Sequence, residues 1–143
     1  MTATYRVLIA DKIAADGLAP LREDPRFELI TKPGLSLADL TQALTEVDAV
    51  IVRSAAKMPR EAMSATTRLK VIGRAGVGVD TIDVDAATEK GIAVLNAPAG
   101  NTISAAELTM ALMLSLARRV AAADRSMKAG AWDRAKLGGS ELY

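Results

Sequence analysis

The sequence has no cysteine and no histidine, and each absence excludes a kind of chemistry. Without cysteine the chain forms no disulfide, offers no thiolate nucleophile and builds no Cys-ligated metal site. Without histidine it lacks the side chain that most often transfers protons near neutral pH, and His-ligated metal sites are excluded as well. Imidazole proton transfer and metal binding through Cys or His therefore cannot belong to these 143 residues.

Aromatic residues are scarce: one Phe, one Trp and two Tyr in a chain of which half the residues are apolar. The core must therefore be built from Val, Ile, Leu, Ala and Met, as is typical of α/β proteins with buried parallel strands. The apolar content also argues against a disordered chain. The 18 basic and 17 acidic residues are dispersed, so no basic patch suggests a nucleic-acid partner.

Long apolar runs are absent too. The most apolar stretch, residues 110–117, is far shorter than the roughly 20 residues that span a bilayer. The first residues show no hydrophobic core of a signal peptide. We therefore expect a soluble cytoplasmic protein that does not associate with membranes.

Apolar runs and helical patterns alternate along the first two thirds of the chain. Strands are predicted at residues 6–10, 27–31, 49–52, 69–72 and 91–95. Helices are predicted at residues 13–22, 36–46, 60–65 and 84–90, with Ser36 as a cap, Pro59 in the first turn of the third and Gly91 ending the fourth. This order predicts an α/β fold, an open parallel five-stranded flavodoxin-like (Rossmann-like) sheet with helices on both faces.

The pattern changes near residue 98, so we expect one domain over residues 1–98 and a second part over 99–143. Residues 104–107 fit a capping box, with Ser104 as the cap of a long helix over about residues 105–128 that Gly130 ends. Residues 110–117 are apolar nearly all the way round, which indicates burial against a second domain or subunit. Residues 132–143 show no strand, and the sequence there looks cut at a linker.

Three polar stretches follow predicted strands: Arg53-Ser54 follows the third, residues 73–78 the fourth and residues 96–102 the fifth. Ligands of open α/β sheets bind at the carboxyl ends of the strands. Two guanidinium groups, a hydroxyl, an amide side chain and Gly-rich backbone N–H groups suit a small carboxylate or phosphate anion. Each stretch taken alone also has a structural explanation: arginine as a solvated charge, glycine for a tight turn and Asn101 as a turn residue.

The Gly-rich stretch does not match the dinucleotide-binding fingerprint. Gly76-Val77-Gly78 is followed by Thr81 where a dinucleotide fingerprint needs its third glycine, so this loop does not predict the main pyrophosphate site. The acidic residues Asp80, Asp83 and Asp85 lie at a predicted helix start, where carboxylates stabilise the positive end of the helix dipole. We interpret them as helix-capping residues and expect no metal site.

In chain order, residues 52–55, 71–80, 91–98, 100–102, 104–107 and 139–143 resemble the N-terminal, substrate-binding portion of D-3-phosphoglycerate dehydrogenases, in the D-isomer specific 2-hydroxyacid dehydrogenase family. The resemblance covers essentially the whole chain. It implies an enzyme that oxidises 3-phosphoglycerate to 3-phosphohydroxypyruvate with NAD in L-serine biosynthesis. Relatives act on glycerate, lactate or formate, and some use NADP; two arginines at strand ends favour a phosphorylated acid.

The resemblance also implies roles for particular residues. Substrate contacts fall on Arg53, Ser54, Arg74, Ala75, Gly76, Val77, Gly78 and Asn101, and Val77 also touches the cofactor. Residues 1–98 correspond to the substrate-binding domain, and residues 99–143 to an inter-domain helix and the truncated start of the nucleotide-binding domain. The long helix crosses into that domain and forms much of the interface of a homodimer or higher oligomer, and Arg134 reaches the active site of a neighbouring subunit. The family's catalytic Arg, Glu and His lie beyond Tyr143, so we expect this chain alone to be inactive. The family's substrate domain also receives a returning C-terminal segment, whose surface this chain leaves bare or covers by self-association.

Two other classes of function remain open on the residues alone. One is a non-catalytic module of flavodoxin-like fold that binds a small anion. A receiver domain of this kind needs an aspartate after the third strand, where the sequence has Arg53-Ser54. The other is an interaction protein that uses the apolar helix as an oligomerisation arm and needs no anion site.

Overall fold

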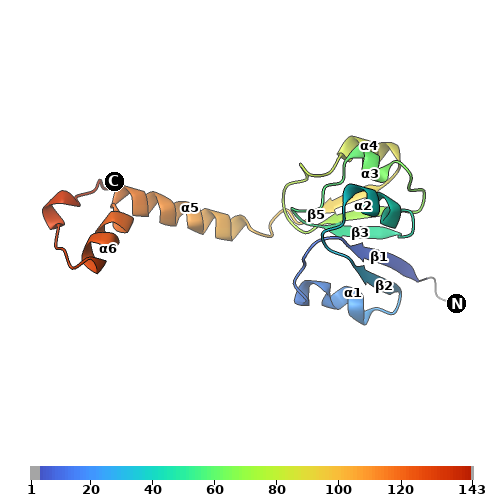
Figure 1. Ribbon diagram of the computed structural model, residues 1–143, viewed down its shortest axis with the longest axis horizontal. Coiled ribbons are helices and arrows are strands. Elements are labelled where there is room, and N and C mark those ends of the chain that lie inside the picture. The colour runs from blue at the N-terminus through green and yellow to red at the C-terminus, as the bar shows by residue number, and fades with distance from the viewer. Residues whose placement is uncertain (1–3, 143) are drawn as a thin grey trace. The chain divides into compact units, whose positions relative to one another are not determined.

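The computed structural model describes residues 4–142, and the chain divides into two compact units, Met1–Gly100 and Asn101–Tyr143. The first unit contains a parallel sheet in the order β2-β1-β3-β4-β5, which confirms the predicted fold class (Figure 1). Its elements are β1 (Tyr5–Ile9), η1 (Asp16–Leu18), α1 (Ala19–Glu23), β2 (Phe27–Thr31), α2 (Leu37–Leu44), β3 (Ala49–Val52), α3 (Arg60–Met63), β4 (Val71–Arg74), α4 (Val84–Glu89) and β5 (Ala93–Asn96).

The larger core lies between the sheet and helices α2, α3 and α4, which cover one face (Figure 1). Because side chains alternate along a strand, every second residue of β1, β3 and β4 points into this core. Leu8, Val50, Val52 and Ile72 are completely buried there. The helices add apolar side chains at helical spacing, such as Leu40 and Leu44 of α2.

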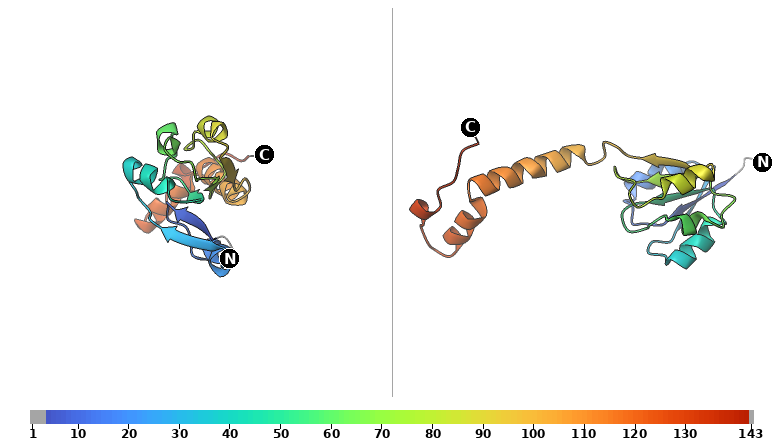
Figure 2. Two further views of the ribbon diagram at one scale, coloured as in Figure 1. Left: turned by 90° about the vertical axis from the view of Figure 1, so that its right-hand side faces the viewer. Right: turned by 90° about the horizontal axis from the view of Figure 1, so that it is seen from above.

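The opposite face of the sheet is covered unevenly. A smaller core formed by Val7, Ile9 and Leu18 packs beside α1 under β1 and β2. Among residues 4–100, no helix covers the same face of the sheet at β5 (Figure 2). Leu95 of β5 is 60% exposed. The expectation of helices on both faces is therefore confirmed, with a bare apolar area at β5.

Local signals set several element ends as predicted. Ser36 accepts a hydrogen bond from the Asp39 amide and begins α2, and Asp83 accepts one from Ala86 and begins α4. Gly91, with a φ of 68°, ends α4. Pro59, predicted in the first turn of α3, instead lies one residue before it as its N-cap, where a missing N–H has no consequence.

Two strands begin two residues later than predicted. β4 begins at Val71 and β5 at Ala93, whereas the apolar runs begin at Leu69 and Gly91. Leu69 and Ile92 are buried at 3% and 5% exposure without being strand residues. Burial therefore begins before strand pairing, and Arg74 belongs to β4 as its last residue. The first predicted helix is also shorter, because η1 and α1 replace it.

The second unit contains α5 (Thr102–Ala117), α6 (Val120–Lys128) and η2 (Arg134–Lys136). The prediction of one helix over residues 105–128 is wrong, because Arg119 adopts a φ of 53°. The Ser140 amide donates to the Ala117 carbonyl at 2.9 Å, which occupies an acceptor that a continuous helix needs. Gly130 ends α6 with a φ of 75°, as predicted.

The predicted capping box at Ser104 is also wrong. The helix begins at Thr102, with Asn101 as its N-cap, and the Ala105 amide donates to the Asn101 carbonyl at 2.9 Å. Ser104 therefore lies inside α5 and cannot adopt the extended backbone of a cap. No residue of α5 is buried, although the helix is apolar nearly all the way round. In residues 4–142, no helix is both long enough and apolar enough to cross a bilayer. The proposed limits of the domains, 1–98 and 99–143, stay predictions.

Candidate functional site

The carboxyl ends of β1, β3, β4 and β5 meet at one edge of the sheet, because the strands are parallel and neighbours. In the β3–β4 and β4–β5 pairs, Arg74 is aligned with Val52 on one side and with Asn96 on the other. Arg53 follows Val52 directly. The ends of β3, β4 and β5 therefore place Arg53, Arg74 and Asn96 at the same edge of the sheet.

Asp11, which follows β1, holds the loop after β3. Its carboxylate atom Oδ2 accepts hydrogen bonds from the amides of Arg53, at 2.6 Å, and Ala56, at 3.0 Å. Asp11 is 6% exposed. The sequence analysis missed this residue, although an acidic residue directly after a buried strand is the signal that could have identified it.

A depression of about 420 Å³ opens beside this loop. Its lining residues come from the ends of β1, β2 and β3: Asp11, Lys12, Pro33, Gly34, Arg53, Ser54 and Ala55. Lys12 is a second residue that the sequence analysis missed. Among residues 4–142, no carboxylate forms an ion pair with Lys12 or Arg53. Two unpaired cations and the Ser54 hydroxyl can therefore face an anion in this depression.

The Gly-rich loop after β4 wraps around the side chain of Arg74. The Arg74 atom Nη1 donates to the Ala75 carbonyl at 3.1 Å, whereas Nε is buried without a partner in the described part of the chain. A Cβ at position 76 would overlap the Arg74 guanidinium, and one at position 78 would lie 2.7 Å from an Asp80 oxygen. A larger residue at position 76 would therefore require the Arg74 guanidinium to move from its present place.

The backbone of the same loop is only partly hydrogen-bonded. The Ala75 amide donates to the Val52 carbonyl at 2.9 Å and the Gly76 amide to the Arg74 carbonyl at 2.8 Å. The amides of Val77 and Gly78 find no acceptor within residues 4–142. Val77 is 40% exposed. Two successive N–H groups are thus free to bind an anionic oxygen.

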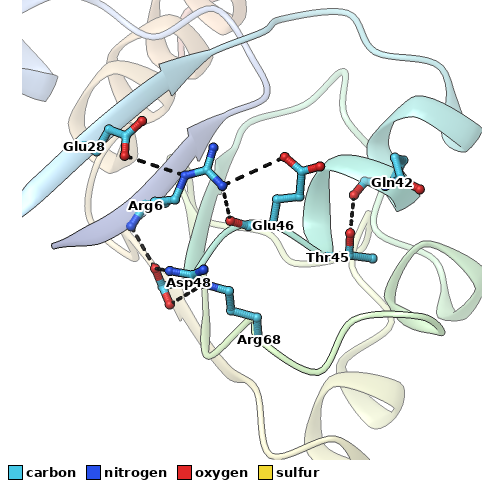
Figure 3. Close-up of polar contacts among 7 residues, drawn as sticks. All are labelled: Arg6, Glu28, Gln42, Thr45, Glu46, Asp48 and Arg68. Atoms are coloured by element: carbon cyan, nitrogen blue, oxygen red, sulfur yellow. Dashed lines mark hydrogen bonds and ion pairs between the residues drawn. The ribbon is translucent and has the colours of Figure 1, made fainter. Parts of the chain in front are cut away.

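The charged groups at the other end of the strands have a different arrangement, because they pair with one another (Figure 3). Arg6 of β1 lies 3.6 Å from a Glu28 carboxylate oxygen, and its amide donates to Asp48 at 2.8 Å. Arg68 donates two hydrogen bonds to Asp48, both of 2.9 Å, and holds the pKa of that carboxyl below its usual value. These charges are therefore paired with one another, whereas Lys12 and Arg53 have no ion-pair partner among residues 4–142.

Asn101 and Arg134 belong to the second unit, so their predicted roles at the substrate site stay predictions. Arg134 begins η2 and lines a largely apolar hollow of about 350 Å³ within that unit. The hollow is formed by Ala123, Ser126, Met127, Trp132, Asp133, Arg134 and Leu137. Nowhere in residues 4–142 do three potential metal-ligating Asp or Glu side chains gather.

Comparisons with known proteins agree on one family. Residues 7–136 match the family model described as D-isomer specific 2-hydroxyacid dehydrogenase, catalytic domain. The D-3-phosphoglycerate dehydrogenase of Bacillus subtilis (strain 168) is 48% identical over 139 residues, which cover 97% of this chain and 26% of that protein. The D-3-phosphoglycerate dehydrogenase of Rattus norvegicus is 42% identical over 134 residues, with 91% and 25% covered. The chain therefore spans about a quarter of the length of these curated relatives.

Solved structures agree with the sequence comparisons. An NAD⁺-bound 3-phosphoglycerate dehydrogenase of Entamoeba histolytica matches with a TM-score of 0.70 and 29% identity, over 81% of this chain and 40% of that chain. An NAD-dependent formate dehydrogenase of Staphylococcus aureus, in complex with NAD, matches with a TM-score of 0.75 and 27% identity, over 96% and 46%. The same fold thus occurs in proteins that act on different small acids.

Proposed function

We propose, since this chain belongs to the D-isomer specific 2-hydroxyacid dehydrogenases, that its first unit binds the anionic groups of 3-phosphoglycerate. The whole protein then oxidises this acid to 3-phosphohydroxypyruvate with NAD, in L-serine biosynthesis. The oxidation removes a hydride from C2 and a proton from the hydroxyl of the acid, and NAD, when bound, takes the hydride. The high identity to phosphoglycerate dehydrogenases supports this substrate over other hydroxy acids.

One observation carries the proposal: the carboxyl edge of the sheet combines unpaired cations with free backbone donors. Lys12 and Arg53 lie beside one depression without carboxylate partners in the described residues, and the Arg74 guanidinium lies at the neighbouring strand end. Val77 and Gly78 add two free amides. A substrate with a phosphate and a carboxylate at opposite ends needs two groups of donors, which this edge offers.

The residues present fit NAD only in part. The Gly-rich loop leads to α4 only at Val84, and Thr81 stands where a fingerprint has its third glycine, so this loop does not provide a pyrophosphate site. Val77, with its exposed apolar side chain, is the residue that we assign to cofactor contact. We propose that the 143 residues alone do not form NADH, because they contain no histidine to accept the hydroxyl proton.

Calorimetric titration with 3-phosphoglycerate tests the binding proposal. We expect saturable binding that Arg53→Ala or Lys12→Ala weakens by about tenfold or more, because each removes a charged partner of the anion. Arg26→Ala is the matched control, because Arg26 is exposed and already paired with Asp24. Unchanged affinity in Arg53→Ala would contradict the site.

Two further arms complete this experiment. D-glycerate, which lacks the phosphate, should bind more weakly than 3-phosphoglycerate, and equal affinity would argue against selection of a phosphorylated acid. NAD reduction is followed in the same buffer. NADH formation by the 143-residue chain would contradict the proposal that these residues are inactive alone.

We also propose that a second copy of the chain covers α5, which overlaps the predicted interface over residues 105–128. Ile103, Leu112 and Leu116 of this helix are 71%, 61% and 83% exposed, and exposed apolar surface of this kind is typical of interfaces. Sedimentation should show a dimer that Leu112→Glu together with Leu116→Glu dissociates. Val84→Glu, on an exposed position of the first unit, is the control, and a monomeric unmodified chain would contradict the proposal.

A further inference from the structure

The side chain of Asn96 contacts the Gly-rich loop from the neighbouring strand. Asn96 is the last residue of β5, and its atom Nδ2 donates to the Val77 carbonyl at 2.7 Å. The next residue, Ala97, donates its amide to the Gly76 carbonyl at 2.9 Å. Two successive carbonyls of the loop are therefore held by two successive residues at the end of β5.

These contacts determine where the loop amides point. In a trans peptide the C=O and the N–H point in opposite directions. The Gly76 carbonyl shares its peptide with the Val77 amide, and the Val77 carbonyl shares its peptide with the Gly78 amide. Because both carbonyls are held on the side of β5, both amides point away from β5, and neither has an acceptor within residues 4–142.

The geometry points to Asn96 as a positioning residue for anion binding, an inference that rests on the proposed function of this edge. Its carboxamide orients the Val77–Gly78 peptide so that the Gly78 N–H, beside that of Val77, donates to an anionic oxygen of the ligand. Successive N–H groups held in this way form an anion-binding nest. Asn96 itself acts only through the loop.

A merely structural role is a weaker explanation of the contact. The pairing of β4 with β5, which aligns Arg74 with Asn96, is made by the backbone and does not need the Asn96 side chain. The Ala97 contact is a backbone contact too, so it persists in any variant at position 96. The Asn96 side chain is exposed, and its removal opens no cavity in the core. Its loss should therefore change ligand binding more than stability.

The test is an amide NMR titration of the 143-residue chain with 3-phosphoglycerate. In the unmodified chain, the Val77 and Gly78 amide protons should shift downfield on binding. In Asn96→Ala, and in Asn96→Leu, which keeps the branched shape without the donor, the Gly78 shift should be lost. The affinity should fall by about tenfold, as for the loss of one hydrogen bond. The melting temperatures should stay near that of the unmodified chain.

Leu95→Ala is the matched control, because Leu95 is the exposed neighbour on the same strand and makes no side-chain hydrogen bond to the loop. It should keep both the shift and the affinity. Unmodified Gly78 shift and affinity in both Asn96 variants would overturn the role of Asn96 and leave the proposed function standing. No 3-phosphoglycerate-dependent shift at all in the unmodified chain would overturn the proposed function together with it.

Discussion

Substitution of Asp11 should separate the geometry of its hydrogen bonds from the charge that strengthens them. A single oxygen, Oδ2, accepts from both the Arg53 and Ala56 amides. Asp11→Ala therefore leaves both amides without an acceptor. Asp11→Asn retains one oxygen that can accept both bonds, as a neutral group. We expect alanine to be clearly more destabilising than asparagine.

The magnitude follows from the two contacts. Hydrogen bonds to charged groups contribute about 1.5–3 kcal/mol each, but the loop that Asp11 holds is exposed at Arg53 and Ser54, so water replaces part of the loss. We expect Asp11→Ala to lower the free energy of unfolding by about 2–4 kcal/mol, and Asp11→Asn by about half as much, since neutral hydrogen bonds are roughly half as strong. Against a typical total of about 5–15 kcal/mol, either loss is easily measured.

Urea unfolding followed by far-UV circular dichroism is the suitable assay. The single tryptophan, Trp132, lies in the second unit, so its fluorescence would not report on the sheet. Asp16→Ala is the control, because Asp16 is exposed and should change stability by no more than about 0.5 kcal/mol. If Asp11→Ala were as mild as this control, the carboxylate would not hold the loop.

Two further predictions concern the rest of the first unit. Arg68 donates hydrogen bonds to Asp48 and lowers the pKa of this carboxyl in the folded state. The charged carboxylate therefore stabilises the folded state above the unfolded-state pKa of about 4. This stabilisation is lost as the pH falls through the lower folded-state pKa. Asp48→Asn should therefore destabilise by about 1 kcal/mol at pH 7, and the difference should shrink as the pH falls below the unfolded-state pKa. Urea unfolding that shows a pH-independent difference would contradict this. Gly91→Ala should lower stability by about 1 kcal/mol through its φ of 68°, whereas Gly17→Ala, at ordinary φ and contact distance, should not; equal thermal unfolding of the two variants would argue against strain at position 91.

The sequence predicts the strands best where burial and pairing coincide. β2 and β3 have the predicted ends, because their apolar or alternating runs are also the paired residues. β4 and β5 begin later than their apolar runs, because Leu69 and Ile92 are buried as loop residues beside the core. Periodicity reports burial, and the ladder of hydrogen bonds is decided by neighbouring strands that a local pattern does not include.

The break between α5 and α6 has no local signal. Neither Gly nor Pro occurs near Arg119, and residues 105–128 read as one continuous helix. The break accompanies a contact from further along the chain, in which the Ser140 amide binds the Ala117 carbonyl. Gly139 packs so closely against Ala117 that a Cβ there would overlap it. A tertiary contact thus overrides helix propensity in a way that spacing cannot reveal.

For the candidate site, the sequence could predict which loops meet but not which polar groups remain free. Parallel strands bring their carboxyl ends to one edge, so Arg53, Arg74 and Asn96 follow from the strand order alone. Whether a polar group serves the fold or a ligand depends on its partners. Asp11 is used to hold a loop, whereas Lys12, the residue next to it, has no carboxylate partner in the described residues. Two adjacent charged residues can therefore differ in role, one holding a loop and the other facing a ligand. Only their hydrogen-bond and ion-pair partners distinguish these roles.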